Sequence, residues 1–393
     1  MKFSVSKEEM QEKLSNIQNI VEKKNTMPIL SHFLLSADTS GEAYIIATDL
    51  ETAIKEPIEI KIEEEGKICI PARKLFEIVK EIEGDLSFET VDEQWIKISV
   101  GTSEFRLACL PSNEFPAWPE FSVLGGGEKI EEFKMDSSLL SEMIEKTIYS
   151  AGESDTRYTL NGLLFHTQAS SASGGRSLTV VGTDGHRLAL IMKPLRGELS
   201  PALSASTGDK KMIVPRKAVS ELRRFLSKES ASGGEVKVSI GKNHLLFSIS
   251  GVQFLTRLIE GTYPNYEQVI PLSNEKKIKL NREAFTKALR RVSVMSRERA
   301  NAVRIDFGDN LLIISSTNPD IGEAKEEVAI EYKGEKFTIG FNARYLIDSL
   351  SAIESENVMF EIQDPLSPAL LREEGLPNEG DGDYKCVIMP MRI

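Results

Sequence analysis

The sequence predicts an α+β protein of three repeated domains, each with two helices packed on antiparallel sheets. Three observations support this fold class: helix starts recur along the chain, apolar strands run into similar turns, and a second helix follows each turn. The repeat has a period of roughly 130 residues, whereas solenoid repeats have periods of about 20 to 50 residues. The 393 residues are therefore expected to form repeated domains.

The first helix of each repeat is expected to begin after a residue whose short side chain accepts hydrogen bonds from free backbone N–H groups, namely Ser6, Asp136 and Asn281. Residues four, eight and eleven positions further on form one stripe on each helix, because this spacing returns to the same helical face. The stripes are Met10, Leu14 and Ile17, then Leu140, Ile144 and Thr147, then Phe285, Leu289 and Val292.

Each repeat also contains an apolar strand that runs into a turn, and a closing apolar strand that ends in proline. The three turns have similar chemistry, with short polar side chains that hydrogen-bond to their own backbone. The turns begin at Thr48, Thr183 and Thr317, and the closing strands end at Pro111, Pro264 and Pro390.

The second helix of each repeat is expected to start at Pro71, at Pro215 and, more loosely, at Phe341. Proline suits the first helical position, because its φ is preset and the N–H that it lacks would be unpaired there. Hinges are predicted at the three glycines of residues 125–127 and in the polar run of residues 273–277. The predicted domains are residues 1–125, 126–271 and 272–393, each long enough to bury its own core.

The charge pattern points in two directions. The 60 acidic and 48 basic residues give a net charge of −12, which argues against a nucleic-acid partner. Two predicted helices are nevertheless basic, while acidic residues concentrate in residues 56–65 and 373–383. A polyanion could bind the basic helices, or their charged faces could simply be solvated. The basic residues are Arg216, Lys217, Arg223, Arg224 and Lys228, and Arg282, Lys287, Arg290, Arg291, Arg297 and Arg299.

Features of other classes of protein are missing from the sequence. No apolar run approaches the roughly 20 residues that span a bilayer, and the chain does not start with a secretory signal, so a cytoplasmic protein is expected. The odd number of cysteines, Cys69, Cys109 and Cys386, favours buried thiols over disulfides or a thiolate metal site.

No catalytic motif accounts for the chain. It has no nucleotide-binding P-loop, no dinucleotide fingerprint and no clustered histidines, so no cofactor and no metal are expected. The tempting pair is Asp184 with His186, which could act as acid and base. A turn architecture shared with the other repeats explains Asp184 better, and no enzyme is predicted.

Ten short strings span the whole chain in a recognisable order. They are MKF at the start, TMPILSHFLL from Thr26, TDLE from Thr48, PARK from Pro71, LPSNEFP from Leu110, RYTLNGLLF from Arg157, TDGHRLA from Thr183, VPRK from Val214, YPNY from Tyr263 and MPMRI from Met389. With these strings the chain resembles the bacterial DNA polymerase III β subunit, the sliding clamp, and TDGHRLA together with the terminal MPMRI is close to diagnostic.

The resemblance implies a head-to-tail homodimer closed into a ring, with helices lining a hole that holds double-stranded DNA. Such a ring needs only weak contacts to phosphate, which carry no sequence information. The chain departs from the family at Thr159, where many members have a second aromatic residue. The DNA-facing residues implied by matching positions are Lys24, Arg73, Lys74, Tyr158, Arg216 and Lys217.

The resemblance also implies a groove for partner peptides. Short linear motifs with a Gln and a Leu/Phe pair would bind there, carried by the DNA polymerase III alpha subunit, clamp-loader subunits, other polymerases and repair proteins. Apolar anchors in a preformed groove suit modest, exchangeable binding. The implied groove residues are Leu160, Thr183, Gly185, His186, Arg187, Leu188, Pro264, Val269, Val387, Ile388, Met389, Pro390, Met391 and Arg392.

For the dimer interface, the resemblance points to Phe105, Val294 and Met295, at an edge-strand joint. Glu104 and Lys325 stand where family members often carry the opposite signs, and we expect this pair to have exchanged charges across the joint.

The sequence gives one further expectation and leaves two alternative functions. The Gly-, Pro- and acid-rich residues 365–385 are expected to form a disordered loop. Two rival functions stay open, an enzyme that uses Asp184 and His186, and a scaffold that binds peptides but never DNA.

Overall fold

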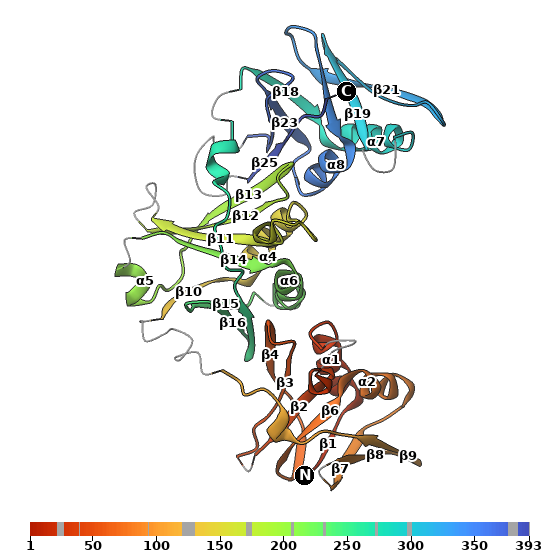
Figure 1. The fold of residues 1–393 in the computed structure, drawn as a ribbon, viewed down its shortest axis with the longest axis vertical. Helices are drawn as coiled ribbons and strands as arrows, with labels where there is room; N and C mark the ends of the chain where they lie inside the picture. Colours follow the sequence, from red (N-terminus) through yellow and green to blue (C-terminus); the bar gives the residue numbers. More distant parts are fainter. Residues whose placement is uncertain are drawn as a thin grey trace. The chain divides into compact units, whose positions relative to one another are not determined.

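The computed structural model describes eleven stretches of the chain, which form two compact units (Figure 1). The first unit comprises residues 1–138, 197–206 and 221–258, and the second comprises residues 139–196, 207–220 and 259–393. The described stretches are residues 1–21, 27–38, 40–92, 94–119, 130–169, 175–205, 208–230, 233–271, 274–296, 301–375 and 384–392.

The first unit contains two antiparallel sheets. The five-stranded sheet has the order β5-β1-β7-β8-β9, and the eight-stranded sheet has the order β10-β15-β16-β17-β4-β3-β2-β6. The strands are β1 Lys2–Val5, β2 His32–Ala37, β3 Ala43–Thr48, β4 Thr52–Pro57, β5 Lys61–Glu64, β6 Gly66–Pro71, β7 Leu86–Asp92, β8 Trp95–Val100, β9 Ser103–Ala108, β10 Glu131–Asp136, β15 Glu235–Ile240, β16 His244–Ile249 and β17 Val252–Arg257.

The second unit contains one antiparallel sheet of twelve strands, in the order β14-β11-β12-β13-β25-β24-β23-β18-β21-β20-β19-β22. The strands are β11 Gly162–Ala169, β12 Arg176–Thr183, β13 Arg187–Pro194, β14 Lys210–Pro215, β18 Lys276–Asn281, β19 Ala302–Gly308, β20 Leu311–Asn318, β21 Gly322–Glu331, β22 Phe337–Asn342, β23 Asn357–Ile362, β24 Ala369–Glu373 and β25 Tyr384–Ile388.

The helices begin close to where the sequence predicts them. Ser6 Oγ accepts from Glu9 N–H at 3.2 Å, and Asn281 Oδ1 accepts from Ala284 N–H at 3.0 Å, as expected of N-caps. Asp136 Oδ1 accepts from Ser138 N–H at 2.7 Å. The described α-helices are α1 Lys7–Ile17, α2 Ala72–Glu81, α4 Ser137–Ile148, α5 Pro201–Ala205, α6 Arg216–Ser230, α7 Arg282–Ser293 and α8 Ala343–Ser351.

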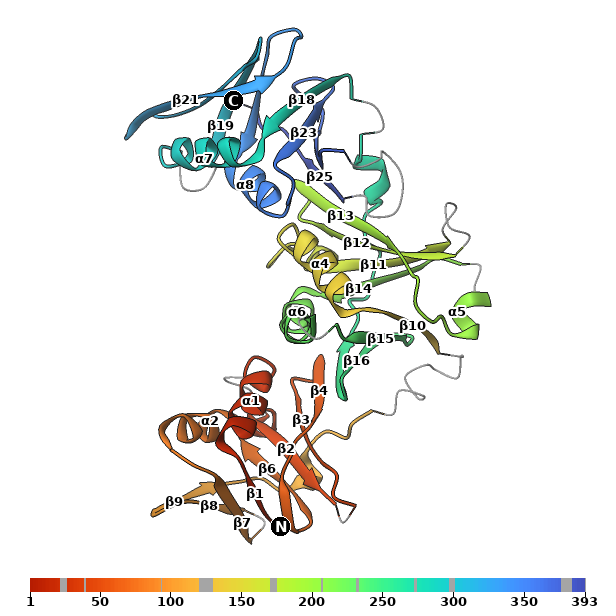
Figure 2. The ribbon, with the colours of Figure 1, turned by 180° about the vertical axis from the view of Figure 1, so that it is seen from behind.

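The predicted helix stripes are confirmed, since all nine residues are buried. Thr147 is buried without cost because its hydroxyl donates to Met143 O at 2.7 Å. Helix α1 packs against α2 in the first unit, and α7 packs against α8 in the second (Figures 1 and 2).

The threefold repeat is confirmed: β1-α1, β10-α4 and β18-α7 begin the repeats, and β6-α2, β14-α6 and β22-α8 supply the second helices. The sheets, however, do not follow the repeats. Strand β17 of the middle repeat pairs with β4 of the first, and β13 of the middle repeat pairs with β25 of the third. The middle repeat therefore shares one sheet with each neighbour.

Three details of the sequence prediction are wrong. Pro71 and Pro215 lie one residue before the second helices and end strands β6 and β14, because their fixed φ also suits extended backbone. None of the three closing strands reaches its predicted proline, since they end at Ala108, Arg257 and Ile388; after the second, Ile259 N–H donates instead to Ile213 O of β14. Residues 369–373, expected to be disordered, form strand β24 between β23 and β25.

The three cysteines are buried and free, as predicted. Burial raises the pKa of the Cys69 and Cys109 thiols to about 12, so neither forms a reactive thiolate near neutral pH. Cys386 lies against the Tyr149 hydroxyl, with 3.1 Å between Sγ and the oxygen.

Gly182 of β12 lies so close to helix α4 that a side chain has no room. A Cβ there would lie 2.4 Å from Thr147 O and 2.9 Å from Leu163 Cδ2. We expect Gly182→Ala to lower the free energy of unfolding by about 1 to 3 kcal/mol, as overpacking does. Urea denaturation measures this loss, and Gly208→Ala is the control because no atom lies within 4 Å of its Cβ. Equal stability of both variants would contradict the expectation.

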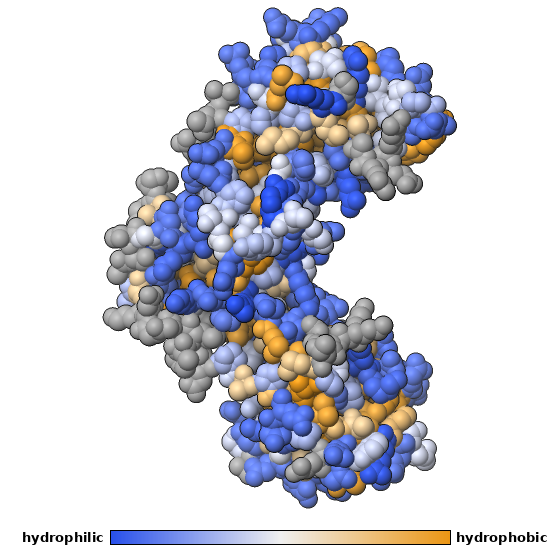
Figure 3. All heavy atoms as spheres, viewed as in Figure 1, coloured by the Kyte–Doolittle hydropathy of each residue, from blue (hydrophilic) through white to orange (hydrophobic). Residues whose placement is uncertain are grey.

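The visible surface of each unit is mostly hydrophilic, with smaller apolar patches (Figure 3). Among the residues that the structure describes, no helix is long and apolar enough to cross a membrane.

Candidate functional site

The turn after β12 has the same hydrogen bonds as the turn after β3. Thr183 Oγ1 donates to Arg187 O at 2.6 Å, and Asp184 Oδ1 accepts from the N–H groups of His186 and Arg187 at 2.9 and 3.0 Å. In the first repeat, Thr48 and Asp49 make the same contacts to residues 51 and 52. The carboxylate of Asp184 therefore stabilises a turn, and it does not contact the imidazole of His186 through any described hydrogen bond.

Gly185 occupies the left-handed region of this turn, with φ of +83°. A Cβ at this position would lie 2.7 Å from Nη1 of Arg157, whose Nη2 donates to Asp184 O at 2.9 Å. The backbone conformation favours glycine here, and a Cβ would also require the exposed guanidinium of Arg157 to move.

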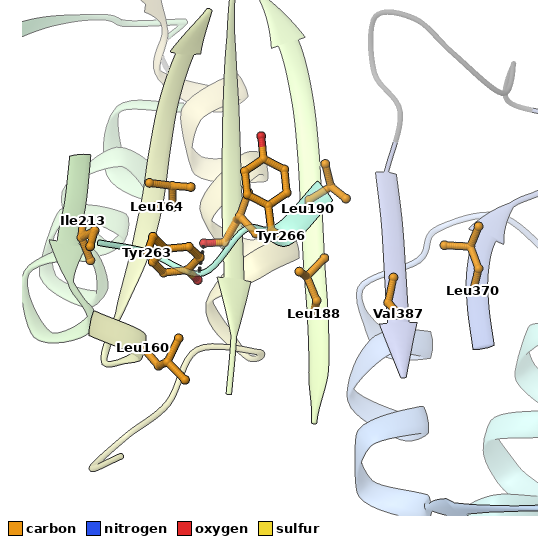
Figure 4. Packing of buried hydrophobic residues seen from close by; sticks show 10 residues of the cluster. Leu160, Leu164, Leu188, Leu190, Ile213, Tyr263, Tyr266, Leu370 and Val387 are labelled. Atoms are coloured by element: carbon orange, nitrogen blue, oxygen red, sulfur yellow. Dashed lines mark hydrogen bonds between the residues drawn. The ribbon is translucent and has the colours of Figure 1, made fainter. Parts of the chain in front are cut away.

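An apolar cluster lies beside the turn, in the second unit (Figure 4). It joins residues of both the middle and the third repeat, since Leu370 and Val387 come from β24 and β25. Val269, Ile259 and Ile270 pack against it and are only partly buried, so they form its accessible rim. The buried members are Leu160, Leu164, Val181, Leu188, Leu190, Ile213, Tyr263, Tyr266, Leu370 and Val387.

Two tyrosines place their polar ends inside this cluster. Tyr263 OH donates to Val181 O at 3.3 Å, and Tyr266 OH lies 2.9 Å from His166 Nδ1. Burial raises the pKa of both tyrosines, and burial together with Lys211 lowers the pKa of His166. A neutral imidazole and two neutral phenols therefore support the cluster, which suits an apolar ligand.

The C-terminal tail is attached to this site. Strand β25 pairs with β13, so that Val387 lies opposite Leu188 and Ile388 opposite Arg187. Met389 N–H donates to His186 O at 2.9 Å, and Met391 N–H donates to Gly340 O of β22 at 2.8 Å. The tail thus connects the turn of the middle repeat to the sheet of the third repeat.

The structure brings together all the groove residues predicted from the sequence. Leu160, Leu188, Val387 and Val269 belong to the cluster or its rim, and the other members lie in the turn or the tail, or next to Tyr263. The exposed or partly exposed ones are Gly185, His186, Arg187, Pro264, Val269, Met389, Pro390, Met391 and Arg392.

Three further residues at this site were not predicted from the sequence: Tyr149, which directly follows α4, and Tyr345 and Asp348 of α8. All three contact the guanidinium of Arg187. Tyr345 and Asp348 are spaced i and i+3 on a helix, which places them on one face, but only the fold shows that this face meets Arg187.

The candidate DNA-facing residues divide between the units. In the second unit, Arg216 and Lys217 begin α6, and Arg216 N–H donates to Asn161 O, beside Tyr158. Tyr158 is 61% exposed, which leaves its ring free to meet a ligand. In the first unit, Arg73 and Lys74 lie in the first turn of α2, whereas Lys24 lies outside the described residues.

Not all of the basic residues of α6 are available to a polyanion. Arg224 donates to Ser15 O at 2.9 Å and also to Asn16 O, at the end of α1. Lys228 lies 2.9 Å from Asn16 Oδ1 and 3.2 Å from a carboxylate oxygen of Glu12. These two residues join the first repeat to the middle repeat, a role that the charge pattern alone did not reveal.

Three of the candidate interface residues lie on strands with one unpaired edge among the described strands, and the other two, Val294 and Met295, directly follow helix α7. Glu104 and Phe105 are on β9, the last strand of the five-stranded sheet. Lys325 is on β21, which pairs with β18 only at Ile330 and Glu331, so residues 322–329 have β20 as their one strand neighbour among the described strands. Val294 is 76% exposed, and Met295 Cε would lie 3.1 Å from a Cβ on Gly322.

The described part of the chain contains no group of three or more His, Cys, Asp or Glu side chains that could hold a metal ion.

Three repeats of two helices on shared antiparallel sheets define the chain, by its fold, as a DNA clamp. It belongs to the DNA polymerase III beta subunit family, whose N-terminal, central and C-terminal domain models match residues 1–119, 134–265 and 267–392.

Known proteins are similar to the chain over its whole length. The beta sliding clamp of Caulobacter vibrioides is 34% identical over 397 residues, and that of Pseudomonas aeruginosa is 33% identical over 395, with all of each chain covered. The crystal structure of the Bartonella birtlesii sliding clamp bound to griselimycin is 32% identical, with a TM-score of 0.90 over the whole of both chains.

Proposed function

We propose that this chain is a DNA sliding clamp, a processivity factor that encircles double-stranded DNA as a ring-shaped homodimer and tethers DNA polymerases. The observation that carries the proposal is the three-repeat clamp fold in a chain that matches beta sliding clamps from end to end. The domains are assigned to residues 1–125, 126–271 and 272–393. The clamp works in the cytoplasm, without cofactor or catalytic residues.

Retention on DNA comes from closure of the ring rather than from tight binding. Tyr158, Arg216 and Lys217 in the second unit, and Arg73, Lys74 and Lys24 in the first domain, supply weak contacts to the sugar-phosphate backbone. Such contacts weaken with salt and ignore base sequence, so they permit sliding. The negative net charge does not prevent retention on DNA, because a closed ring stays on DNA without a high affinity for it.

Partners dock through a groove made of the turn, the rim of the apolar cluster and the C-terminal tail. Val269, Pro264 and Met389 offer accessible apolar surface above a buried floor. A peptide with a Leu/Phe pair would bury its side chains there, while its Gln would bond to exposed polar groups. The partners are the polymerase III alpha subunit, clamp-loader subunits, other polymerases and repair proteins.

The dimer forms by pairing β9 of one subunit with β21 of the next. An antiparallel register that sets Phe105 opposite Ala324 also sets Glu104 opposite Lys325 and Arg106 opposite Glu323, two pairs of opposite charge on one face. Within the subunit, Glu104 Oε2 lies 2.7 Å from Lys97 Nζ, and Lys325 Nζ lies 3.0 Å from Glu327 Oε1. Both side chains therefore already have a neighbour of opposite charge on their own sheet. Val294 and Met295 add apolar contact beside β21.

The test is topological. Protein assembled on nicked circular DNA by a clamp loader with ATP should stay bound through gel filtration, and should be released when a restriction enzyme linearises the circle. Equal retention on linear and circular DNA would show ordinary binding and overturn the proposal. Peptide binding without any retention on circles would favour the scaffold instead.

A further inference from the structure

The guanidinium of Arg187 is bonded to two carboxylates of its own chain. Its Nε donates to Asp184 Oδ2 at 3.1 Å, and its Nη1 donates to Asp348 Oδ2 at 2.6 Å. The side chain is 10% exposed. Two carboxylates therefore neutralise Arg187 from two sides, and it has little charge left to offer to a partner.

Aromatic rings enclose the same group. The guanidinium carbon lies 4.4 Å from the ring centroid of Tyr345 and 5.4 Å from that of Tyr149. Tyr149 is itself fixed, because its hydroxyl contacts Ser349 Oγ at 3.2 Å and Tyr384 OH at 3.0 Å. Helix α8 of the third repeat thus presents Tyr345, Asp348 and Ser349 on one face to the middle repeat.

The electrostatics agree with the geometry. Burial by itself lowers the pKa of Arg187, but the hydrogen bond that it donates to Asp348 and the charges of Asp184 and Asp348 outweigh burial and raise the pKa above its ordinary value. Removing one carboxylate would leave a half-neutralised, largely buried cation, which is costly.

The backbone of Arg187 shows what this side chain controls. Its N–H donates to Asp184 Oδ1, and its carbonyl accepts from Thr183 Oγ1, so Arg187 closes the turn. Its strand partner is Ile388, and the neighbouring His186 O accepts from Met389 N–H. The residue whose guanidinium contacts Asp184 and Asp348 is therefore also bonded through its backbone to the turn, and it pairs with the strand that leads into the tail.

We propose that Asp348 is a positioning residue of the peptide groove. It holds Arg187 against helix α8, and through Arg187 it fixes the turn of residues 183–187 in the conformation that receives a partner peptide. This inference rests on the proposed function of the groove. Asp348 acts from the third repeat on a turn of the middle repeat, without contacting the peptide.

The experiment measures binding of a fluorescent synthetic peptide with a Gln and a Leu-Phe pair to the full-length protein. Asp348→Asn should weaken binding roughly tenfold, because the amide can still accept a hydrogen bond but no longer carries the charge that pairs with Arg187. Asp348→Glu should restore part of the affinity. In an Arg187→Met background, Asp348→Asn should have no further effect, which a general loss of stability would not produce.

Two further measurements make the outcome decisive. Glu356→Gln, which removes one exposed carboxylate near the end of α8, should bind the peptide as the wild type does. Hydrogen exchange at residues 184–188 should be faster in Asp348→Asn than in the wild type. Wild-type affinity with unchanged exchange overturns the inference. If the wild type itself binds no peptide, the groove proposal fails, and the exchange rates still decide whether Asp348 holds the turn.

Discussion

Deletion of residues 389–393 is expected to abolish binding of partner peptides while leaving the protein dimeric. The deletion removes Met389 and Met391, together with the backbone bonds to His186 O and Gly340 O. Burying one Met side chain is worth about 1.5 to 3 kcal/mol, so losing two anchors costs about 3 kcal/mol or more. That cost corresponds to at least about a 100-fold loss of affinity.

Fluorescence anisotropy with the labelled peptide measures this loss, and sedimentation velocity reports the dimer. Leu366→Ala is the matched control: Leu366 is 80% exposed in the third repeat and does not belong to the apolar cluster. It should bind the peptide normally. Micromolar binding retained by the truncated protein would refute the assignment of the groove, and a monomeric truncated protein would show that the tail also supports the joint.

Reversing one charge at the proposed joint is expected to weaken the ring strongly. Glu104→Lys sets like charges opposite each other in the β9–β21 pairing, which costs about 1 kcal/mol or less at each joint. A closed homodimer contains two such joints, so the two costs add to at most about 2 kcal/mol and raise the dimer Kd by up to roughly 30-fold. Analytical ultracentrifugation at low salt measures the dimer Kd, and added salt should reduce the effect.

A compensating charge reversal distinguishes an effect on the joint from an effect on the subunit's own stability. Glu104→Lys combined with Lys325→Glu should restore the dimer, because the pair again has opposite signs. Glu89→Lys is the control, since it reverses the same charge on β7, which is not an edge strand. An unchanged dimer Kd for Glu104→Lys at low salt would contradict the proposed β9–β21 register.

Local chemistry made much of the fold predictable. Caps such as Ser6 and Asn281 need only their own helix, and stripes such as Met10, Leu14 and Ile17 follow from helical geometry, so both could be recognised without knowing the fold. Pairing between distant strands leaves no such local signal. Nothing near Leu188 in the sequence indicates that Val387 will lie beside it, and the sheets shared between repeats were therefore missed.

In the candidate site, too, local contacts could be predicted from the sequence and contacts between distant residues could not. The turn at Asp184 could be interpreted correctly, because its bonds run to the next three residues and recur at Asp49. The other residues of the proposed groove, including those of the tail, could be predicted only from the resemblance to a family. Asp348 was missed because it lies 161 residues from Arg187 in the chain, and only the packing of α8 brings the two together.

Because the middle repeat contributes strands to two sheets that it shares with its neighbours, it is not an independent module. Excised from the chain, it would expose β13 and β17 as bare edges at once, and such edges invite aggregation. Chimeras and split reporters built from this protein should therefore be joined within surface turns rather than at the repeat boundaries. The segment that repeats in the sequence therefore differs from the segment that folds as one compact unit.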